Sequence, residues 1–169
     1  LVLTAVFGCN NQPQIIEITP GILISVPQKS KIATADSENS QKKWEAAFGD
    51  DQFAVFRYPI TNQDSANVID QKMAFKKNID AFIQVFDFKN LDSTFTYKDE
   101  FSECDLSFDY SGSTGNYRFY GRFLANKQDF IAFCFQTPFP VDNYSKKTKD
   151  KLFNSISPSI RCGDKRGRE

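Results

Sequence analysis

The sequence predicts one α+β domain, in which an antiparallel sheet of about six to seven strands is combined with a long helix and a C-terminal helix. Three observations support this prediction. Apolar residues recur every three or four positions over 65–86, which is the spacing of one helix face. Four aromatic segments with the composition of β-strands follow between 93 and 138, and a second helical spacing of apolar residues comes near the C-terminus. With 169 residues and 18 phenylalanines, the chain is long and apolar enough to bury one core, which is expected between the long helix and the sheet.

The part of the chain before the long helix is expected to hold one strand and one hairpin. Residues 14–27 are rich in β-branched side chains interrupted by Pro-Gly, which predicts an extended entry and then a strand over 22–26. The mostly polar stretch 28–41 is expected to be a surface loop. A hairpin is predicted over 42–60, where two apolar arms flank a Gly-Asp turn and Pro59 ends the second arm.

Two helices are predicted from apolar residues three and four positions apart. The long helix is expected over about 65–86, and its apolar positions are Val68, Phe75, Ile79, Phe82, Ile83 and Phe86. The closing helix is expected to be capped near Asp142 or Asn143 and stopped by Pro158. Its four-residue repeat consists of Tyr144, Thr148, Leu152 and Ile156.

The four aromatic segments predict consecutive antiparallel strands over 93–101, 103–111, 116–125 and 129–138. Joining the second and third across Gly112 to Gly115 places Ser111 opposite Asn116. The other pairs that this register brings together are Phe108–Phe119 and Cys104–Phe123 on one face, with Asp109–Arg118 and Asp105–Arg122 on the other. Because a slip of one residue would lose both the apolar and the charged pairs, this register is the strongest local prediction.

In their order along the chain and in their amino-acid composition, these elements resemble the Mog1/PsbP-like superfamily. The segments that carry the resemblance are ILISVP, KKWEAAFGDDQFAVFRYPI, the 65–86 helix, GNYRFYGRFL, DFIAFCF and KLFNSISPSI. The resemblance covers about residues 20–160, the expected domain, and implies a curved sheet covered by the two helices. It also implies a role in binding or assembly, without naming site residues. A cystatin-like fold is the nearest alternative, although the early hairpin and the closing helix are against it.

Composition excludes several classes of function. Lys plus Arg and Asp plus Glu are 21 each, so no net charge favours a nucleic-acid partner. The chain has no histidine, which excludes catalytic triads and zinc sites that are built on imidazole. The cysteine spacings give no metal motif, and no cofactor is expected.

The N-terminal stretch LVLTAVFGCNNQ ends an apolar run at Val6-Phe7-Gly8-Cys9, which resembles the lipobox of bacterial lipoproteins. Residues 1–8 are then the truncated end of a signal peptide, and Cys9 is the lipidation site through which the protein is held on the membrane. Residues 9–19 are expected to be a flexible tether, and 161–169 a polar tail. The alternative is an edge strand with a buried cysteine.

The remaining cysteines offer one possible disulfide. Cys104 and Cys134 are expected about 9 to 10 Å apart, since one strand separates theirs, which is too far for a bond. Any disulfide must therefore include Cys162, paired with Cys104 or Cys134. The alternative is that these thiols are simply buried.

The polar sheet face carries Asp105, Asp109, Arg118, Tyr120 and Arg122. Because each aspartate has its own arginine, which lowers the carboxyl pKa, a solvated face of ion pairs is favoured over acid and base catalysis. The expected function is that of a lipid-anchored cell-envelope lipoprotein, a non-catalytic binding or assembly module with a protein partner. The alternatives are an envelope hydrolase using these Asp and Tyr groups, and a domain that binds a small apolar ligand between the helices and the sheet.

Overall fold

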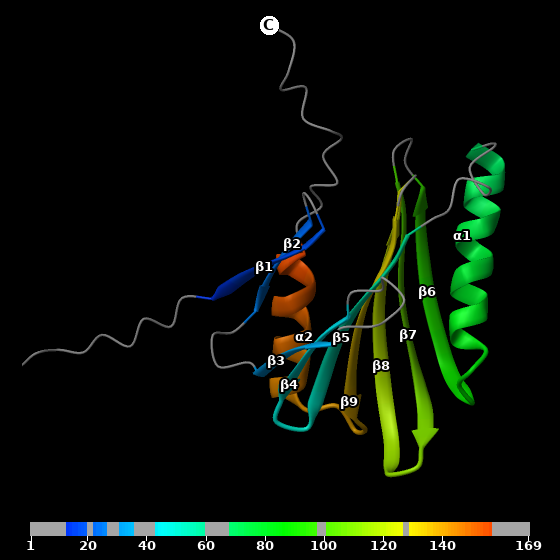
Figure 1. The fold of residues 1–169 in the computed structure, drawn as a ribbon. Helices are drawn as coiled ribbons and strands as arrows, with labels where there is room; N and C mark the ends of the chain where they lie inside the picture. The colour runs from blue at the N-terminus through cyan, green and yellow to red at the C-terminus, as the bar shows by residue number, and fades with distance from the viewer. Residues whose placement is uncertain are drawn as a thin grey trace, which may run out of the picture.

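The computed structural model describes residues 13–19, 22–26, 31–35, 43–59, 68–97, 101–126 and 129–156. The elements within these ranges, in chain order, are β1 (Gln14–Thr19), β2 (Ile22–Val26), β3 (Lys31–Ala35), β4 (Lys43–Phe48), β5 (Asp51–Pro59), α1 (Val68–Ile83), β6 (Phe88–Tyr97), β7 (Ser102–Gly112), β8 (Gly115–Ala125), β9 (Asp129–Pro138) and α2 (Asn143–Ser155) (Figure 1).

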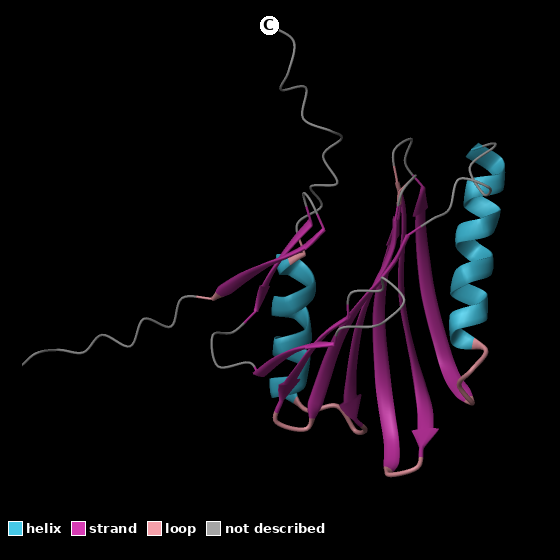
Figure 2. Cartoon of the chain, in the orientation of Figure 1, coloured by secondary structure: helices cyan, strands magenta, loops and turns pink. Residues whose placement is uncertain are grey.

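Seven strands form one antiparallel sheet in the order β3-β4-β5-β9-β8-β7-β6, and β1 and β2 pair with each other as a separate hairpin. The sheet is curved and lies between the two helices, with α1 on one side and α2 on the other (Figures 1 and 2). β9 is buried along almost its whole length, which explains why its sequence DFIAFCFQTP is apolar nearly throughout rather than alternating. This architecture confirms the predicted fold class.

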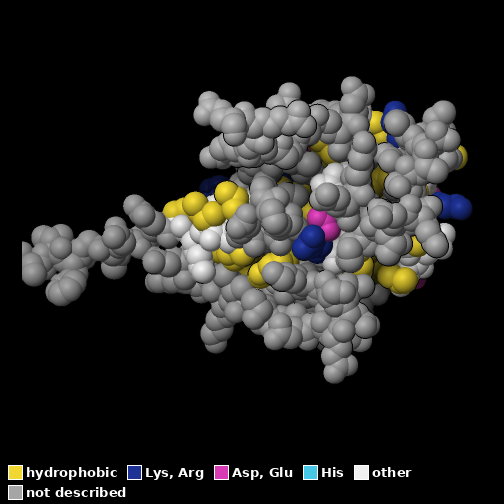
Figure 3. All heavy atoms as spheres, turned by 45° about the horizontal axis from the view of Figure 1, so that its top comes forward, with side chains coloured by type: hydrophobic (Ala, Val, Ile, Leu, Met, Phe, Trp, Pro, Cys, Tyr) yellow, Lys and Arg dark blue, Asp and Glu magenta, His cyan; other side chains and the backbone are white. Residues whose placement is uncertain are grey.

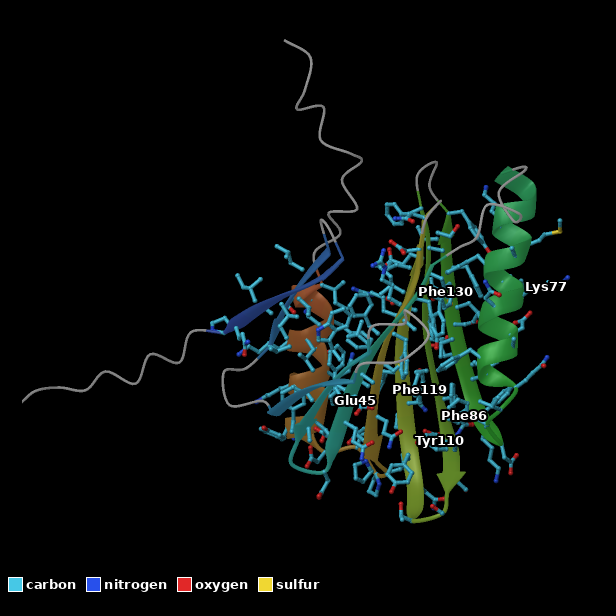
Figure 4. All side chains as sticks on the ribbon, in the orientation of Figure 1. Glu45, Lys77, Phe86, Tyr110, Phe119 and Phe130 are labelled. Atoms are coloured by element: carbon cyan, nitrogen blue, oxygen red, sulfur yellow. The ribbon has the colours of Figure 1, made fainter. Side chains whose placement is uncertain are left out.

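One apolar cluster lies between the sheet and α1. Its buried members are Phe75, Ile79, Ile83, Cys104, Leu106, Phe108, Phe119, Phe123, Phe130, Ala132 and Cys134. On α1, Phe75, Ile79 and Ile83 lie four residues apart and so share the helix face that meets the sheet. Phe108 of β7 and Phe119 of β8 stack with their ring centroids 4.8 Å apart. Phe119, labelled in Figure 4, faces α1, because its ring centroid lies 5.6 Å from that of Phe82 on that helix.

A second apolar cluster lies on the opposite face, under α2 and the β1–β2 hairpin. Its buried members are Ile24, Val26, Ala46, Phe48, Phe53, Val55, Leu124, Ile131, Phe133, Phe135, Leu152, Phe153 and Ile156. The expectation that this domain has a single core beneath the long helix is therefore wrong. The physical reason is that the central strands β5 and β9 carry large apolar side chains on both faces, and each face needs its own cover.

Three expected boundaries are corrected by the structure. Residues 14–19, placed in the flexible tether, form β1 because their backbone pairs with β2 and Ile16 packs against the α2-side cluster. Residues 31–35, placed in a surface loop, form the edge strand β3 paired with β4. β6 begins at Phe88 and ends at Tyr97, earlier than the expected 93–101, because it pairs with β7 along its length. Residues 1–12 and 157–169 lie outside the described residues.

The predicted register of the β7–β8 hairpin is confirmed. Phe108 pairs with Phe119 and Cys104 with Phe123, and Ser111 lies opposite Asn116. The charged pairs Asp109–Arg118 and Asp105–Arg122 fall on the other face, as expected. The β4–β5 hairpin is confirmed as well, and α2 is capped by the side chain of Asp142, which accepts a hydrogen bond from the backbone N–H of Ser145 at 2.7 Å.

Gly121 occupies a position of β8 where the α1-side cluster leaves no room for a side chain. A Cβ built there would lie 2.5 Å from Cε2 of Phe123 and 2.9 Å from Cε1 of Phe119. We expect Gly121→Ala to lower the free energy of unfolding by about 1 to 3 kcal/mol, because two buried rings must move. Urea unfolding measures this loss. Gly112→Ala, next to the surface ring of Tyr117, is the milder control, and an equal loss in both variants would contradict the prediction.

Candidate functional site

The polar face between β7, β8 and α2 holds a closely paired charged group. The guanidinium of Arg122 binds Asp105 in a bidentate manner, with Nε to Oδ1 and Nη2 to Oδ2 both at 2.7 Å. Its Nε also lies 3.4 Å from Oε1 of Glu103. The hydrogen bond to Asp105 raises the pKa of Arg122 above its ordinary value, against the opposing effect of burial. Arg122 is therefore permanently charged, and its charge is balanced locally.

Arg122 also connects the sheet to the C-terminal helix. Its Nη1 donates a hydrogen bond to the backbone oxygen of Phe153 at 3.1 Å, near the end of α2. The last carbonyl groups of a helix have no partner within the helix, so a cation is stabilising at this point. The Arg122 guanidinium carbon also lies 5.7 Å from the Phe153 ring centroid. The predicted face is thus partly covered by α2 rather than fully solvated, and Arg122 anchors that helix.

The second predicted ion pair, Asp109–Arg118, lies nearer the turn of the β7–β8 hairpin. Arg118 Nη1 donates to Oδ1 of Asp109 at 2.9 Å and its Nη2 donates to Ser107 Oγ at 3.0 Å. Asn90 Nδ2 donates to the other carboxylate oxygen of Asp109 at 2.7 Å. Burial opposes ionisation of Asp109, but the hydrogen bonds from Asn90 and Arg118 and the Arg118 charge outweigh it and lower its pKa below the ordinary value.

Tyr120 lies between the two ion pairs along β8, and two cations lie near its ring. The guanidinium carbon of Arg118 lies 5.7 Å from its ring centroid, and Lys149 Nζ of α2 lies 5.1 Å from it. All five residues of the predicted polar face are therefore brought together as expected. Their geometry is that of paired charges packed on aromatic rings, and the lowered pKa of Asp109 does not suit that carboxyl to exchange a proton near neutral pH.

The lowered pKa of Asp109 predicts a pH-dependent contribution to stability. The contribution is present above the pKa of an unfolded aspartate, about 4, and is lost as the pH falls through the lower folded value. We expect Asp109→Asn to cost up to about 1 kcal/mol at neutral pH, because the pair is only half-buried. Measured by urea unfolding, the gap to the wild type should narrow as the pH falls below about 4. The exposed Asp87→Asn is the control, and a gap that stays constant down to about pH 3 would contradict the prediction.

The two described cysteines are buried and unbonded on the α1 side of the sheet. β8 separates their strands, which confirms the expectation that Cys104 and Cys134 do not bridge. Burial, together with nearby carboxylates, raises the pKa of Cys104 to about 12, and burial raises the pKa of Cys134 as well. Both thiols are therefore neutral and shielded. Cys9 and Cys162 lie outside the described residues, so lipidation of Cys9 stays a prediction. The predicted disulfide between Cys162 and either Cys104 or Cys134 is not formed, because both of those thiols are free.

A row of polar and aromatic side chains that sequence reasoning missed crosses the sheet beyond the end of α1. Tyr110 Oη donates to Gln136 Oε1 at 2.6 Å, and Gln136 Nε2 donates to Gln52 Oε1 at 3.2 Å. The rings of Phe86 and Tyr117 lie 5.1 and 5.5 Å from that of Tyr110, and Phe86 and Tyr110 are labelled in Figure 4. Burial, and then Tyr117, raises the pKa of Tyr110. Sequence alone could not join these residues, because their contact depends on the strand order β5-β9-β8-β7.

A shallow apolar hollow lies beneath the β1–β2 hairpin. It is lined by Ile16, Ile24, Val26, Trp44, Glu45, Ala46, Phe53 and Val55. Its free space is close to that of one water molecule, and its walls are hydrocarbon. This hollow, which is lined by described residues alone, is too small to enclose a small apolar ligand. It therefore gives no support to the alternative of a ligand-binding domain.

Two further features of the described residues concern metal and membrane binding. Among the described residues, no group of three or more His, Cys, Asp or Glu side chains is arranged to hold a metal ion. None of the described helices has the length and apolar character needed to cross a bilayer.

Comparison with known proteins places the fold. No protein-family model matches the chain, and no curated protein matches its sequence. The solution structure of cyanobacterial PsbP (CyanoP) from Synechocystis superposes with a TM-score of 0.58 and 15% identity, over 93% of this chain and 98% of that one. The chain has the PsbP-like fold. The Ran-binding protein Mog1p of Saccharomyces cerevisiae superposes less closely, with a TM-score of 0.47 and 9% identity, over 87% of this chain and 85% of that one. At 15% identity the likeness to PsbP concerns architecture alone.

Proposed function

We propose that this chain is a lipid-anchored protein of the cell envelope that acts as a non-catalytic binding or assembly module. Acyl chains on Cys9 hold it on the membrane, and the folded domain binds a protein partner. Several acyl chains on one residue give nearly permanent attachment, whereas one chain alone gives only marginal binding. The neutral chain, with 21 basic and 21 acidic residues, supplies no electrostatic attachment of its own.

The observation that carries the proposal is the position of Cys9. It ends the apolar run LVLTAVFGC and comes five residues before Gln14, where β1 begins. The residues between them, Asn10 to Pro13, are polar or proline, a composition suited to a short link between a lipid anchor and a domain. A signal peptide that ends at an acylated cysteine must leave the domain intact, and the first described element lies entirely after Cys9.

The chemistry of the sheet face supports binding rather than catalysis. Asp105 and Asp109, which the hydrolase alternative requires, are each held by a guanidinium group at 2.7 to 2.9 Å. Against the effect of burial, the hydrogen bonds from Asn90 and Arg118 lower the pKa of Asp109, so this carboxylate is a weak base near neutral pH. A rigid sheet with a helix on each face is a scaffold that presents its edges, loops and outer helix faces to other molecules.

Acylation of Cys9 is tested by growing cells that produce the full chain with labelled palmitate. We expect the wild-type protein to incorporate label and to fractionate with membranes, and Cys9→Ala to lose both properties completely. Cys162→Ala is the matched control, because it removes a different cysteine and should retain label and membrane association. Equal label in the wild type and Cys9→Ala, or a wild-type protein without label, would refute the proposed anchor.

A further inference from the structure

The β1–β2 hairpin has two faces of different character. Its inner face packs on the domain, with Ile24 and Val26 each 1% exposed. The pairings of Ile15 with Ser25 and of Glu17 with Leu23 place these four positions on the opposite face. On that outer face Ile15 is 67% exposed and Leu23 38% exposed. Two aliphatic side chains are therefore exposed on one face, and Figure 3 shows apolar side chains at the surface on the hairpin side of the molecule.

The direction of this outer face is fixed relative to the rest of the domain. The backbone N–H of Ser25 donates to Ser155 Oγ at 3.2 Å, and Ser155 Oγ lies 3.0 Å from the backbone oxygen of Ser25. These contacts join β2 to the last turn of α2, and Figure 1 shows the hairpin crossing that end of the helix. Because Ile24 and Val26 are buried beneath it, the hairpin cannot turn its outer face without losing core contacts.

The outer face is also close along the chain to the proposed lipid anchor. Ile15 follows Cys9 by six residues, and an extended chain of that length reaches at most about 20 Å. A membrane that holds the acyl chains of Cys9 therefore lies within about 20 Å of Ile15. A contact made under such tethering is intramolecular, so even a small apolar surface is occupied for much of the time.

We propose that the outer face of the β1–β2 hairpin, formed by Ile15 and Leu23, rests on the membrane interface and sets the orientation of the anchored domain. This inference depends on the proposed acylation of Cys9 and adds a second membrane contact to it. The occupant is the headgroup and upper acyl region of the bilayer, because two aliphatic side chains are too few for a stable protein interface. The contact is shallow, since its depth is that of two side chains on a strand pair.

Two other exposed apolar side chains provide controls. Val85 is 78% exposed and Met73 is 57% exposed. Met73 belongs to α1 and Val85 follows its C-terminal end, so both lie across the sheet from the hairpin (Figure 1). If exposure alone drew side chains to the bilayer, these residues would contact it as well. If the hairpin is tethered, we expect Ile15 and Leu23 to contact the bilayer and Val85 and Met73 to remain in water.

The test uses the full-length acylated protein in vesicles of about three parts phosphatidylethanolamine to one part phosphatidylglycerol, an anionic bilayer. Leu23→Cys, Ile15→Cys and Val85→Cys are made in a Cys162→Ser background and labelled with an environment-sensitive NBD fluorophore. Acylated Cys9 has no free thiol, and the buried thiols of Cys104 and Cys134 are shielded. We expect NBD on the Ile15 and Leu23 variants to shift its emission to the blue and to be quenched by headgroup spin-labelled lipid. NBD on the Val85 variant should behave as in water.

The outcomes separate the two proposals. Protein that floats with the vesicles while NBD on both hairpin variants emits as in water overturns the docking of the hairpin and leaves the anchor intact. Equal blue shifts in all three variants also overturn it, because the contact would then have no preferred face. Protein that does not float, and whose mass shows no acyl chains, overturns the anchor and the docking together. The use of two hairpin positions guards against one substitution disturbing the hairpin.

Discussion

Phe108→Ala is expected to lower the free energy of unfolding by about 3 to 5 kcal/mol, because it leaves a cavity at the centre of the α1-side cluster. Phe108 is fully buried at 0% exposure. Its ring centroid lies 4.8 Å from that of Phe119 and 5.2 Å from that of Phe86. Phe86 follows the C-terminal end of α1, so the cavity weakens the contact between the helix and the sheet. The loss is measured as a lower midpoint of urea unfolding at unchanged slope.

Tyr144→Ala is the control for this variant. Tyr144 is 64% exposed on α2, and its removal should change stability by no more than about 0.5 kcal/mol. A midpoint for Phe108→Ala close to that of the wild type would mean that α1 packs elsewhere and that the α1-side cluster is not a core.

Phe133→Ala is expected to cost a similar amount, about 3 to 5 kcal/mol, although its ring lies on the opposite face of the sheet. Phe133 is fully buried in the α2-side cluster, at the middle of the central strand β9. Its loss opens a cavity beneath α2 and the β1–β2 hairpin, so Trp44, which packs against the same cluster, should report the change in its fluorescence. Unfolding followed by that fluorescence measures the effect.

The two clusters can be separated by a double-variant cycle. Phe108→Leu and Phe133→Leu are milder, so that the double variant stays folded. Because Phe108 and Phe133 belong to different clusters on opposite faces, their losses should add within about 0.5 kcal/mol. A coupling well above that value would mean that the two faces share one core.

The parts of the fold that could be predicted are those in which two independent patterns agree. The β7–β8 register followed from the pairing of Phe108 with Phe119 and, on the other face, of Asp109 with Arg118. The helix α1 followed from apolar residues at steps of three and four. In each case a shift of one residue would have moved apolar side chains into water and charges into the core.

The parts that were missed depend on tertiary contacts. β1 and β3 are short and flanked by proline or polar residues, and each becomes a strand only through pairing with β2 or β4. The second core was missed because a central strand such as β9, apolar on both faces, does not reveal from its sequence what covers each face.

The candidate site was predictable only where it depends on pairing within one hairpin. Complementary charges across one hairpin indicated the Asp105–Arg122 pair, but its contact with the carbonyl of Phe153 requires α2 to be packed on that face. The outward position of Ile15 was missed because residues 14–19 were expected to belong to the tether that follows Cys9, not to a strand. The alternation in QIIEIT, with Ile16 inward and Ile15 outward, is the signal that could have revealed it.

Mass spectrometry of the N-terminal peptide, from full-length protein recovered from the membrane fraction, tests the proposed lipid anchor most directly. We predict that the mature chain begins at Cys9 and that its sulfur carries a diacylglyceryl group, so the tryptic peptide Cys9 to Lys29 is found only with that added mass. A chain that still contains Val6-Phe7-Gly8 before an unmodified Cys9, recovered from the soluble fraction, would contradict the anchor.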